Sequence, residues 1–481
     1  MSREAEQTGR AGRWIEERLA LGTVIRVIFL RNVPLGVGVL YTLGFAAAFC
    51  FILQAATGVV LALFYAPTPD HAYASVAYLT NRLPFGGFVR GLHHWGASAM
   101  VVLVMLHLVV VFSLAAYKRP REATWLVGVA LLVLTLGFGF TGYLLPWDGK
   151  AYWATSVGTN MAGTMPLLGE SLLRVVRGGT ELGAAALTRF YAVHVLVLPA
   201  VLVGLLAVHI ALVIYHGVSV PPTLWGGDLV ADPEIEQLRS PTLDRDAERY
   251  LAFKRRGRPF WPDVIFEDLV IAIVVFLVLA GLAVTQGAPL EAQADPADTA
   301  YIPRPEWYFL FLFQLLRYFP GQLEWVGIII LPLLALGALL ALPFIDRRIE
   351  RRLRYRPVAA AGAVIVAGGI GFLTTAAVLG TPPSQVEERG IQLAAAQILG
   401  RTHYRQYCAD CHGANGEGTP TGPSLAEAAR RRDANFIHSY IENPGRMRRG
   451  ALMPAFLDQL GHQQVEEVAQ YVLTMAGTEA R

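Results

Sequence analysis

Charged residues and cysteines are both scarce in this chain of 481 residues. Only 16% of its residues are charged while 54% are hydrophobic, and a soluble protein of this length carries more charge. The three cysteines are too few for a disulfide framework, or for an iron–sulfur cluster in addition to the pair Cys408 and Cys411. The net charge of +3 is small and no segment interleaves basic with aromatic residues, so no nucleic acid is expected as a partner. The composition indicates an integral membrane protein.

The N-terminus lacks the features of a cleaved signal peptide. It begins "MSREAEQTGRAGRWIEERLA", which is polar and charged, with no short apolar core and no small-residue cleavage site. We therefore expect residues 1–35 to form a cytoplasmic amphipathic segment.

Long apolar runs predict an all-α fold. A helix needs about 20 residues to cross a bilayer, and seven segments are long enough: 36–65, 91–115, 124–145, 191–215, 264–286, 323–345 and 358–380. The run 295–320 is aromatic but broken by prolines, so we expect an interfacial or re-entrant piece there. Hydropathy falls after about residue 385. The prediction is a seven-span transmembrane helical bundle followed by a small soluble α-helical domain at the C-terminus.

Basic residues indicate how the bundle is oriented. They gather in the loops after the even-numbered spans: Lys118, Arg119 and Arg121; Lys254, Arg255, Arg256 and Arg258; Arg347, Arg348, Arg351, Arg352, Arg354 and Arg356. Since such loops stay in the cytoplasm, the N-terminus is predicted to be cytoplasmic and the C-terminal domain to lie outside.

The segment "YCADCHG" (407–413) predicts a covalent haem. In a Cys-x-x-Cys-His run the thiols of Cys408 and Cys411 form thioethers to a haem, and His412 is the proximal iron ligand. A redox dithiol or half of a zinc site is the alternative, but no second cysteine pair completes a zinc site. Met453, in "GALMPAF", is the expected sixth ligand, with Met447 as its rival. Residues 386–478 resemble a class I cytochrome c, and c-type haem is attached on the outer face of the membrane, where the loop charges place this domain.

Four histidines within the predicted spans are functional candidates, because ionisable groups are costly there. His93 and His107 are fourteen residues apart, and His194 and His209 are fifteen apart. These spacings keep each pair within about 60° of one helix face and about 21 Å apart along the axis. Each of these histidines alone reads as a core residue, but the matched spacing predicts two haem b sites: His93 with His194 outside, and His107 with His209 inside.

Neighbouring polar residues are assigned more simply. His94 points about 100° away from His93 and reads as a packing residue. Arg90, one turn before His93, is placed to pair with a propionate of the outer haem. Arg121, with Lys118 and Arg119, is placed to do so on the inner side, although the positive-inside charge bias explains these three equally well.

These residues resemble a known family. The histidine pairs, "GYLLPWDGKAYWA" (142–154), "LTRFYAVHVLVLP" (187–199) and "PEWY" (305–308) resemble cytochrome b of the cytochrome bc complexes. The fifteen-residue gap and three final spans resemble the chloroplast and Gram-positive type, in which cytochrome b and subunit IV are separate chains. The resemblance implies the following domains: a four-helix di-haem core at 36–220, a cytoplasmic linker at 221–262, a subunit-IV-like region at 263–381 and a cytochrome c domain at 386–481.

The resemblance implies a quinol:cytochrome c oxidoreductase subunit. In the family, quinol is oxidised in an outer-side pocket against a docked Rieske iron–sulfur protein, which passes one electron on towards haem c. The other electron crosses two b haems to an inner quinone site, and protons are translocated. We expect two haem b and one haem c as cofactors and a bacterial cytoplasmic membrane location. The expected partners are membrane lipid, a second copy of the chain, and a cytochrome c or terminal oxidase as acceptor.

The resemblance also implies site residues. Glu306 is the expected proton acceptor, with Tyr308 beside it, because a carboxylate on an apolar, proline-bounded turn takes up a proton more readily than one in water. A helix-capping or interfacial glutamate is the alternative. The residues expected to line the quinone sites are Pro305, Trp307, Tyr143, Pro146 and Trp147 outside, and His216 inside.

The chain departs from the family in two respects. The chloroplast type carries an extra haem on a cysteine where alignment through "QAATG" (54–58) places Thr42, and Cys50 reads as a packing residue. No Rieske ligand set is present, so the iron–sulfur protein is expected to be a separate chain.

Two other functions account for part of the sequence pattern. A di-haem b membrane anchor that relays electrons for a dehydrogenase, without quinol bifurcation, needs the haem histidines but not "PEWY". A transporter with proton-relaying histidines leaves "YCADCHG" unexplained.

Overall fold

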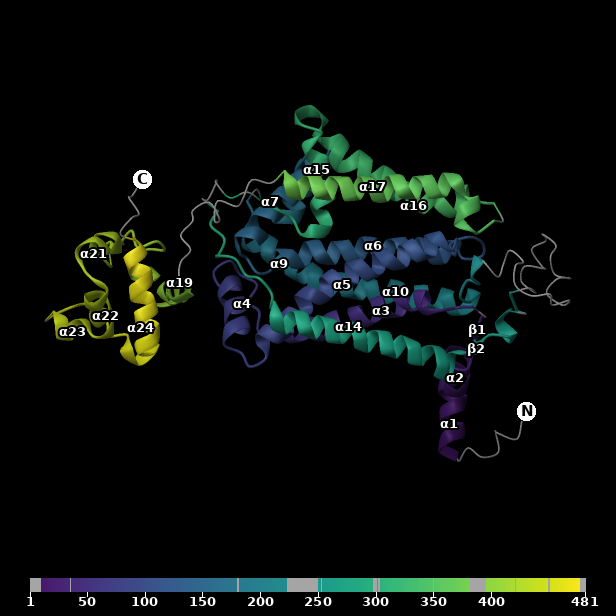
Figure 1. The fold of residues 1–481 in the computed structure, drawn as a ribbon, viewed down its shortest axis with the longest axis horizontal. Helices are drawn as coiled ribbons and strands as arrows, with labels where there is room; N and C mark the ends of the chain where they lie inside the picture. Colours follow the sequence, from purple (N-terminus) through teal and green to yellow (C-terminus); the bar gives the residue numbers. More distant parts are fainter. Residues whose placement is uncertain are drawn as a thin grey trace. The chain divides into compact units, whose positions relative to one another are not determined.

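A computed structural model gives the fold of the chain (Figure 1). It describes residues 10–34, 36–179, 181–222, 250–251, 253–296, 301, 303–348, 350–380, 395–419, 421–448 and 450–475. The chain divides into two compact units, Met1–Thr381 and Pro382–Arg481. Most of the predicted linker 221–262 falls outside the described residues.

Seven helices within the described residues are long and apolar enough to cross a membrane: Val39–Ala62, Gly86–Ser113, Glu122–Tyr143, Ala184–His216, Phe260–Thr285, Val326–Ile345 and Pro357–Leu379. They contain α3 (Leu43–Ala62), α5 (Gly86–Ser113), α6 (Glu122–Tyr143), α9 (Ala184–Ala192) with α10 (Leu198–His216), α14 (Ile265–Thr285), α16 (Leu331–Ile345) and α17 (Pro357–Leu379). The predicted all-α fold is confirmed.

Shorter elements complete the first unit. The helices are α1 (Arg10–Leu19), α2 (Leu21–Ile28), α4 (Ala72–Asn81), α7 (Gly149–Gly163), α8 (Gly169–Arg177) and α15 (Leu310–Arg317). Strands β1 (Asn32–Val33) and β2 (Arg258–Pro259) pair antiparallel. Helix α7 starts where it does because the Asp148 carboxylate caps it, accepting from the Ala151 N–H at 2.8 Å.

In two of the membrane helices a proline explains a π-helical turn. Val193–Val197 and Val326–Ile330 are π turns, and a proline, Pro199 or Pro332, follows each by two residues. Proline has no N–H to donate and its ring collides with the carbonyl four residues earlier. The helix accommodates it by inserting one residue into the preceding turn.

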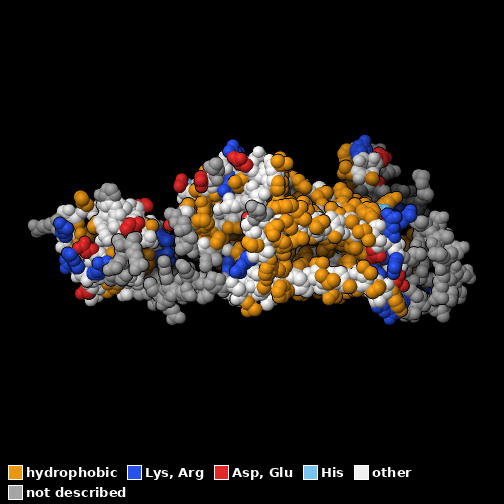
Figure 2. Space-filling view, turned by 90° about the horizontal axis from the view of Figure 1, so that it is seen from above, with side chains coloured by type: hydrophobic (Ala, Val, Ile, Leu, Met, Phe, Trp, Pro, Cys, Tyr) orange, Lys and Arg blue, Asp and Glu red, His pale blue; other side chains and the backbone are white. Residues whose placement is uncertain are grey.

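The outer surface of the seven-helix unit is apolar. Leu277, Val278 and Val364 expose 62%, 57% and 71% of their surface, as helices surrounded by lipid do. Figure 2 shows apolar side chains over the middle of this unit, with Lys and Arg gathered towards the end where β1 and β2 lie.

A buried ionic cluster joins the loop after α5 to the last two membrane helices. Lys118 Nζ lies 2.8 Å from Asp346 Oδ1 and donates to the Arg348 carbonyl at 2.7 Å. Arg356 lies 2.8 Å from Asp346 Oδ2, and Tyr117 donates to the same oxygen at 2.6 Å. Because each charge has a partner, the cluster holds α16 and α17 against the core without stranding an ion.

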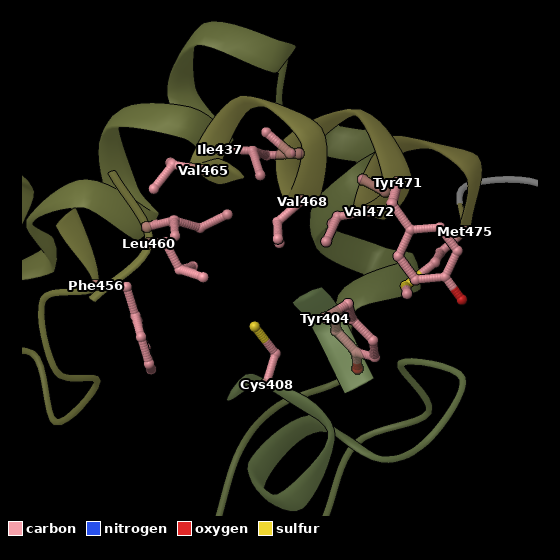
Figure 3. Packing of buried hydrophobic residues seen from close by; sticks show 13 residues of the cluster. Tyr404, Cys408, Ile437, Phe456, Leu460, Val465, Val468, Tyr471, Val472 and Met475 are labelled. Carbon is pink, nitrogen blue, oxygen red and sulfur yellow. The ribbon is translucent and has the colours of Figure 1, made fainter. Parts of the chain in front are cut away.

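The second unit is a small helical domain. It contains α19 (Ala395–Tyr407), α20 (Ala409–His412), α21 (Leu425–Arg431), α22 (Ala434–Glu442), α23 (Pro444–Met447) and α24 (Leu457–Thr474). Its core brings α19 and α22 onto one face of α24, where Val465 and Val468 are fully buried. Figure 3 shows Cys408 facing the apolar side chains of α24.

Candidate haem and quinone sites

The four predicted haem ligands lie on two parallel spans. His93 and His107 are on α5, His194 is in the π turn before α10, and His209 is on α10. The ring centroids of His93 and His194 are 6.4 Å apart and their planes cross at 71°. That separation fits two imidazoles that share one metal ion, since each metal–nitrogen bond is about 2 Å long.

The π turn explains the unequal spacing of the two histidine pairs. The pair on α5 is fourteen residues apart and the other pair fifteen. A π turn holds one residue more than an α turn, and His194 lies within such a turn. The extra residue is absorbed there, so His194 and His209 stay on one face of their helix.

Four glycines lie against the four imidazoles. A Cβ at Gly142 would be 2.6 Å from His194 Cε1, and one at Gly58 would be 3.2 Å from His93 Cε1. At the other level, a Cβ at Gly44 would be 3.1 Å from His107 Cε1, and one at Gly128 would be 3.3 Å from His209 Cε1. The glycines are fourteen residues apart on α3 and on α6. They keep the helix surface open beside each histidine, as a flat cofactor requires.

Two threonines set which ring nitrogen is free at the first level. Thr57 Oγ1 donates to the Leu53 carbonyl at 2.7 Å and lies 2.9 Å from Nδ1 of His93. Because the Thr57 hydroxyl donates its only proton to the Leu53 carbonyl, its oxygen accepts a hydrogen bond from the Nδ1–H of His93. Nε2 of His93 therefore keeps its lone pair. Thr141 repeats the arrangement, with Nδ1 of His194 at 3.0 Å. Both histidines are thereby held in the tautomer that ligates through Nε2.

The second unit holds its haem motif in a similar way. His412 is buried and its Nδ1–H donates to the Pro423 carbonyl at 2.8 Å, which leaves Nε2 free. Burial raises the pKa of the Cys408 thiol to about 12, so this cysteine is a poor thiolate ligand or redox nucleophile. Among the described residues no group of three or more His, Cys, Asp or Glu is placed to hold a metal ion. The free Nε2 of His412 and the buried Cys408 beside it fit the predicted haem attachment.

The two candidate methionine ligands have different surroundings. Met453 packs against the buried cluster that contains Cys408. Met447 ends the short helix α23 and is 45% exposed. Burial beside the haem motif favours Met453.

The "PEWY" segment packs against α6 and α7. Glu306 Oε1 lies 2.9 Å from Lys150 Nζ, and the Tyr143 hydroxyl donates to the Arg304 carbonyl at 3.0 Å. A Cβ at Gly139 on α6 would be 2.7 Å from the Tyr308 hydroxyl oxygen, so this glycine makes room for the tyrosine. Glu306, Tyr308 and Tyr143 are therefore brought together, and burial raises the pKa of Tyr308.

The other residues predicted to line the outer quinone site lie in different surroundings. Trp307 is 45% exposed and its indole N–H is 3.4 Å from Ser98 Oγ. Trp147 packs in a buried cluster, with its ring 5.5 Å from that of Tyr152. Pro146 and Pro305 are half-buried on the chain beside Trp147 and Glu306.

The predicted propionate partners have protein partners of their own. Arg90 donates to the Ala288 and Pro289 carbonyls at 2.9 and 2.6 Å. Arg121 donates to the Gly217 carbonyl at 2.9 Å and to that of His216 at 3.2 Å, so it caps the end of α10 next to the predicted inner site. Thr42 directly precedes α3 in the first span, and Cys50 is fully buried in a packed cluster.

Several of these site residues were missed in the sequence. The fourteen-residue spacing of the glycines repeats that of the histidines on α5 and was available as a signal. Thr57 and Thr141 each precede one of those glycines, in "TG" pairs. Lys150 stands in the "GYLLPWDGKAYWA" motif, but its partner Glu306 is 156 residues away, so no local pattern links them.

Comparisons with known proteins agree with the geometry. Three family models match: cytochrome b/b6/petB at residues 29–217, cytochrome b(C-terminal)/b6/petD at 293–398, and cytochrome c at 398–476. The cytochrome b6 of Heliobacterium modesticaldum is 42% identical over 210 residues, which cover 43% of this chain and 99% of that protein. The cytochrome b6 of Cyanidium caldarium is 40% identical over 208 residues, which cover 43% of this chain and 97% of that protein.

A solved structure, a hyperthermophilic respiratory complex III, has a similar fold. Its TM-score is 0.63 at 28% identity, covering 77% of this chain and 92% of that chain. The seven apolar helices and this likeness indicate a multi-pass membrane protein that belongs to a multi-subunit respiratory complex. The cytochrome b and cytochrome c family matches imply haem as its cofactor. The chain belongs to the cytochrome b/b6 family, here as a cytochrome b6 and subunit-IV-like fusion that carries a cytochrome c domain.

Proposed function

We propose that the chain is the quinol-oxidising subunit of a quinol:cytochrome c oxidoreductase. In this proposal, quinol binds on the outer side between the "PEWY" segment, the turn before α7 and a separate Rieske iron–sulfur protein. The soluble domain lies on the outer face of a bacterial cytoplasmic membrane and delivers electrons to a c-type cytochrome or terminal oxidase, and the complex is a homodimer.

One turn of α6 carries the proposal. Gly139 lies against Tyr308 of the "PEWY" segment, and Gly142, three residues later, lies against His194. Residues three apart are neighbours on the same side of a helix, so Tyr308 of the segment with Glu306 and His194 of the first histidine pair contact α6 about one turn apart. A di-haem anchor without quinol chemistry needs no such proximity.

The residues of the proposed quinol site have different roles. Oxidation of a quinol to a quinone releases two electrons and two protons. The Glu306 carboxylate accepts one of the hydroxyl protons, as a general base within reach of bound quinol does. Tyr143 and Tyr308 shape the pocket walls, and the buried hydroxyl of Tyr308 holds its own proton because burial raises its pKa.

Other residues hold the cofactors. His93 with His194, and His107 with His209, would hold two haem b, while Cys408, Cys411, His412 and Met453 would hold haem c. When bound, these groups supply one-electron carriers at two membrane depths and in the soluble domain. Thr57 and Thr141 keep the first pair of imidazoles oriented. His216 and Arg121, together at the end of α10, are the proposed inner quinone site.

Replacement of Glu306 tests the proposal. With short-chain menaquinol and ubiquinol as alternative donors, reduction of haem c is followed in membranes that contain the whole complex. Glu306→Gln is expected to slow the reaction about 100-fold or more while the haem spectra stay unchanged. Glu324→Gln, an exposed glutamate of the same region, is the control and should keep the wild-type rate. No quinol oxidation by the wild type would refute the proposed function.

A further inference from the structure

We propose that Lys150 is a positioning residue for Glu306: its ammonium group holds the carboxylate in the orientation that receives a quinol proton. This inference rests on the proposed function, since it deepens the role of Glu306.

The geometry at Lys150 is specific. The residue is the second of α7, directly after the capping Asp148 and Gly149. Its Nζ lies 2.9 Å from Glu306 Oε1, and the two side chains are only 29% and 19% exposed. The same ammonium group lies 5.5 Å from the centre of the Tyr143 ring. Lys150 therefore contacts two residues of the proposed quinol site from a third element.

Partial burial makes this ion pair count for more than a surface pair. Exposed pairs contribute little because water and salt screen them, whereas screening weakens as water is excluded. The ammonium group therefore holds the Glu306 carboxylate in one position, and a fixed position is what transfer of a proton from bound quinol needs.

Other titratable groups also face Glu306 and do not replace Lys150. His94 approaches from α5, Tyr143 from α6 and Tyr308 from the segment of Glu306 itself. A tyrosine is neutral over the working pH range. Lys150 is the group that reaches Glu306 with a full positive charge at ion-pair distance.

Two carboxylates flank Lys150 on its other side. The Glu291 carboxylate is among the side chains nearest to Gly149, and its Oε2 accepts from the Tyr301 hydroxyl at 2.8 Å. Asp148 Oδ2 accepts from the Glu291 N–H at 3.1 Å. Burial raises the pKa of the Asp148 carboxyl group. Glu291 is exposed, so the polar cluster that starts at Glu306 ends at solvent.

The test is the steady-state kinetics of quinol oxidation by the whole complex, with the same two quinols as donors. In Lys150→Met the maximal rate should fall by about tenfold or more, because the carboxylate is no longer held in place. The quinol concentration that gives half the maximal rate should stay close to that of the wild type. Lys150→Arg, which keeps the charge, should restore most of the maximal rate. Lys254→Met, on the chain before β2, is the control and should change nothing.

A double variant separates this role from a purely structural one. If Lys150 acts through Glu306, adding Lys150→Met to Glu306→Gln should cost no further activity, because contacting residues are not additive. An unchanged maximal rate in Lys150→Met, or a further loss in the double variant, would overturn the inference. Such a result leaves the proposed function standing if the wild type oxidises quinol and Glu306→Gln does not.

Discussion

Gly142 of α6 and His194 of the π turn lie in direct contact, closer than any other residue with a side chain would allow. A Cβ at position 142 would be 2.6 Å from Cε1 and 3.1 Å from Nε2 of the imidazole. The proposed first haem site thus depends on a missing side chain as much as on its ligands, and this dependence can be tested.

Gly142→Ala should impair the first b-haem site. The added methyl group must displace His194, because contacts under 3.0 Å are not tolerated, and the pair with His93 is then lost. We expect the b-type signal in a reduced-minus-oxidised spectrum to fall by about half, since one of two sites fails. Gly137→Ala on the same helix, where a Cβ meets nothing within 4 Å, should leave the spectrum unchanged.

Thr57→Val should weaken haem retention at the same site. It removes the oxygen that accepts the Nδ1–H of His93. Loss of such a partner typically lowers the affinity for the ligated metal group by about 10- to 100-fold. The measurement is the rate at which b haem transfers to an excess of apomyoglobin. Thr57→Ser keeps the oxygen and should behave as the wild type; equal transfer rates in all three proteins would contradict the assigned tautomer.

Met453→Leu should lower the midpoint potential of haem c without releasing the haem. The thioethers of Cys408 and Cys411 keep the group attached, while loss of a methionine ligand removes what raises the potential. A redox titration of the c-type absorbance measures the change. Met447→Leu, at an exposed position, should leave the potential unaltered, and the reverse pattern would make Met447 the ligand.

Lys118→Met should loosen α16 and α17 from the core. Burial alone would raise the pKa of Asp346, but hydrogen bonds from Lys118 and Tyr117 and nearby positive charges hold it below its ordinary value. The variant removes one of the partners of the Asp346 carboxylate and leaves Arg356 and Tyr117, at a cost of about 1 to 3 kcal/mol, seen as a lower unfolding temperature in detergent. Arg348→Gln, at an exposed side chain, is the control.

The same cluster should be sensitive to acid. A carboxylate whose pKa is lowered by folding stabilises the folded state fully above its unfolded pKa, about 4. That contribution disappears as the pH falls through the lowered value. The difference in unfolding temperature between the wild type and Lys118→Met should therefore shrink below pH 4; a constant difference down to pH 2 would contradict this origin.

The sequence was a good guide to the membrane helices and a poor one to their contacts. Hydropathy identified seven spans because each must be apolar over its whole length. It began the fourth at residue 191, whereas the helix starts at Ala184, because Arg189 and Thr188 lower the local hydropathy without breaking the helix. The π turn at Val193–Val197 was not foreseen, although Pro199 is its physical cause.

Long-range pairings were the harder part. The spacing of the histidines suggested that they meet, and His93 and His194 do lie together. The Lys150–Glu306 pair joins the two halves of the membrane unit, and no periodicity relates residues on different elements. Such contacts follow from how the helices pack, which a one-dimensional pattern does not contain.

Haem content tests the account most directly. Acid–acetone extraction of the purified chain separates non-covalent from covalent haem, and pyridine haemochrome spectra identify each type. We expect two extractable b-type haems and one retained c-type haem for every chain. A single extractable haem, or no retained haem, would contradict the assignment of His93, His107, His194 and His209 to two sites or of Cys408 and Cys411 to a third.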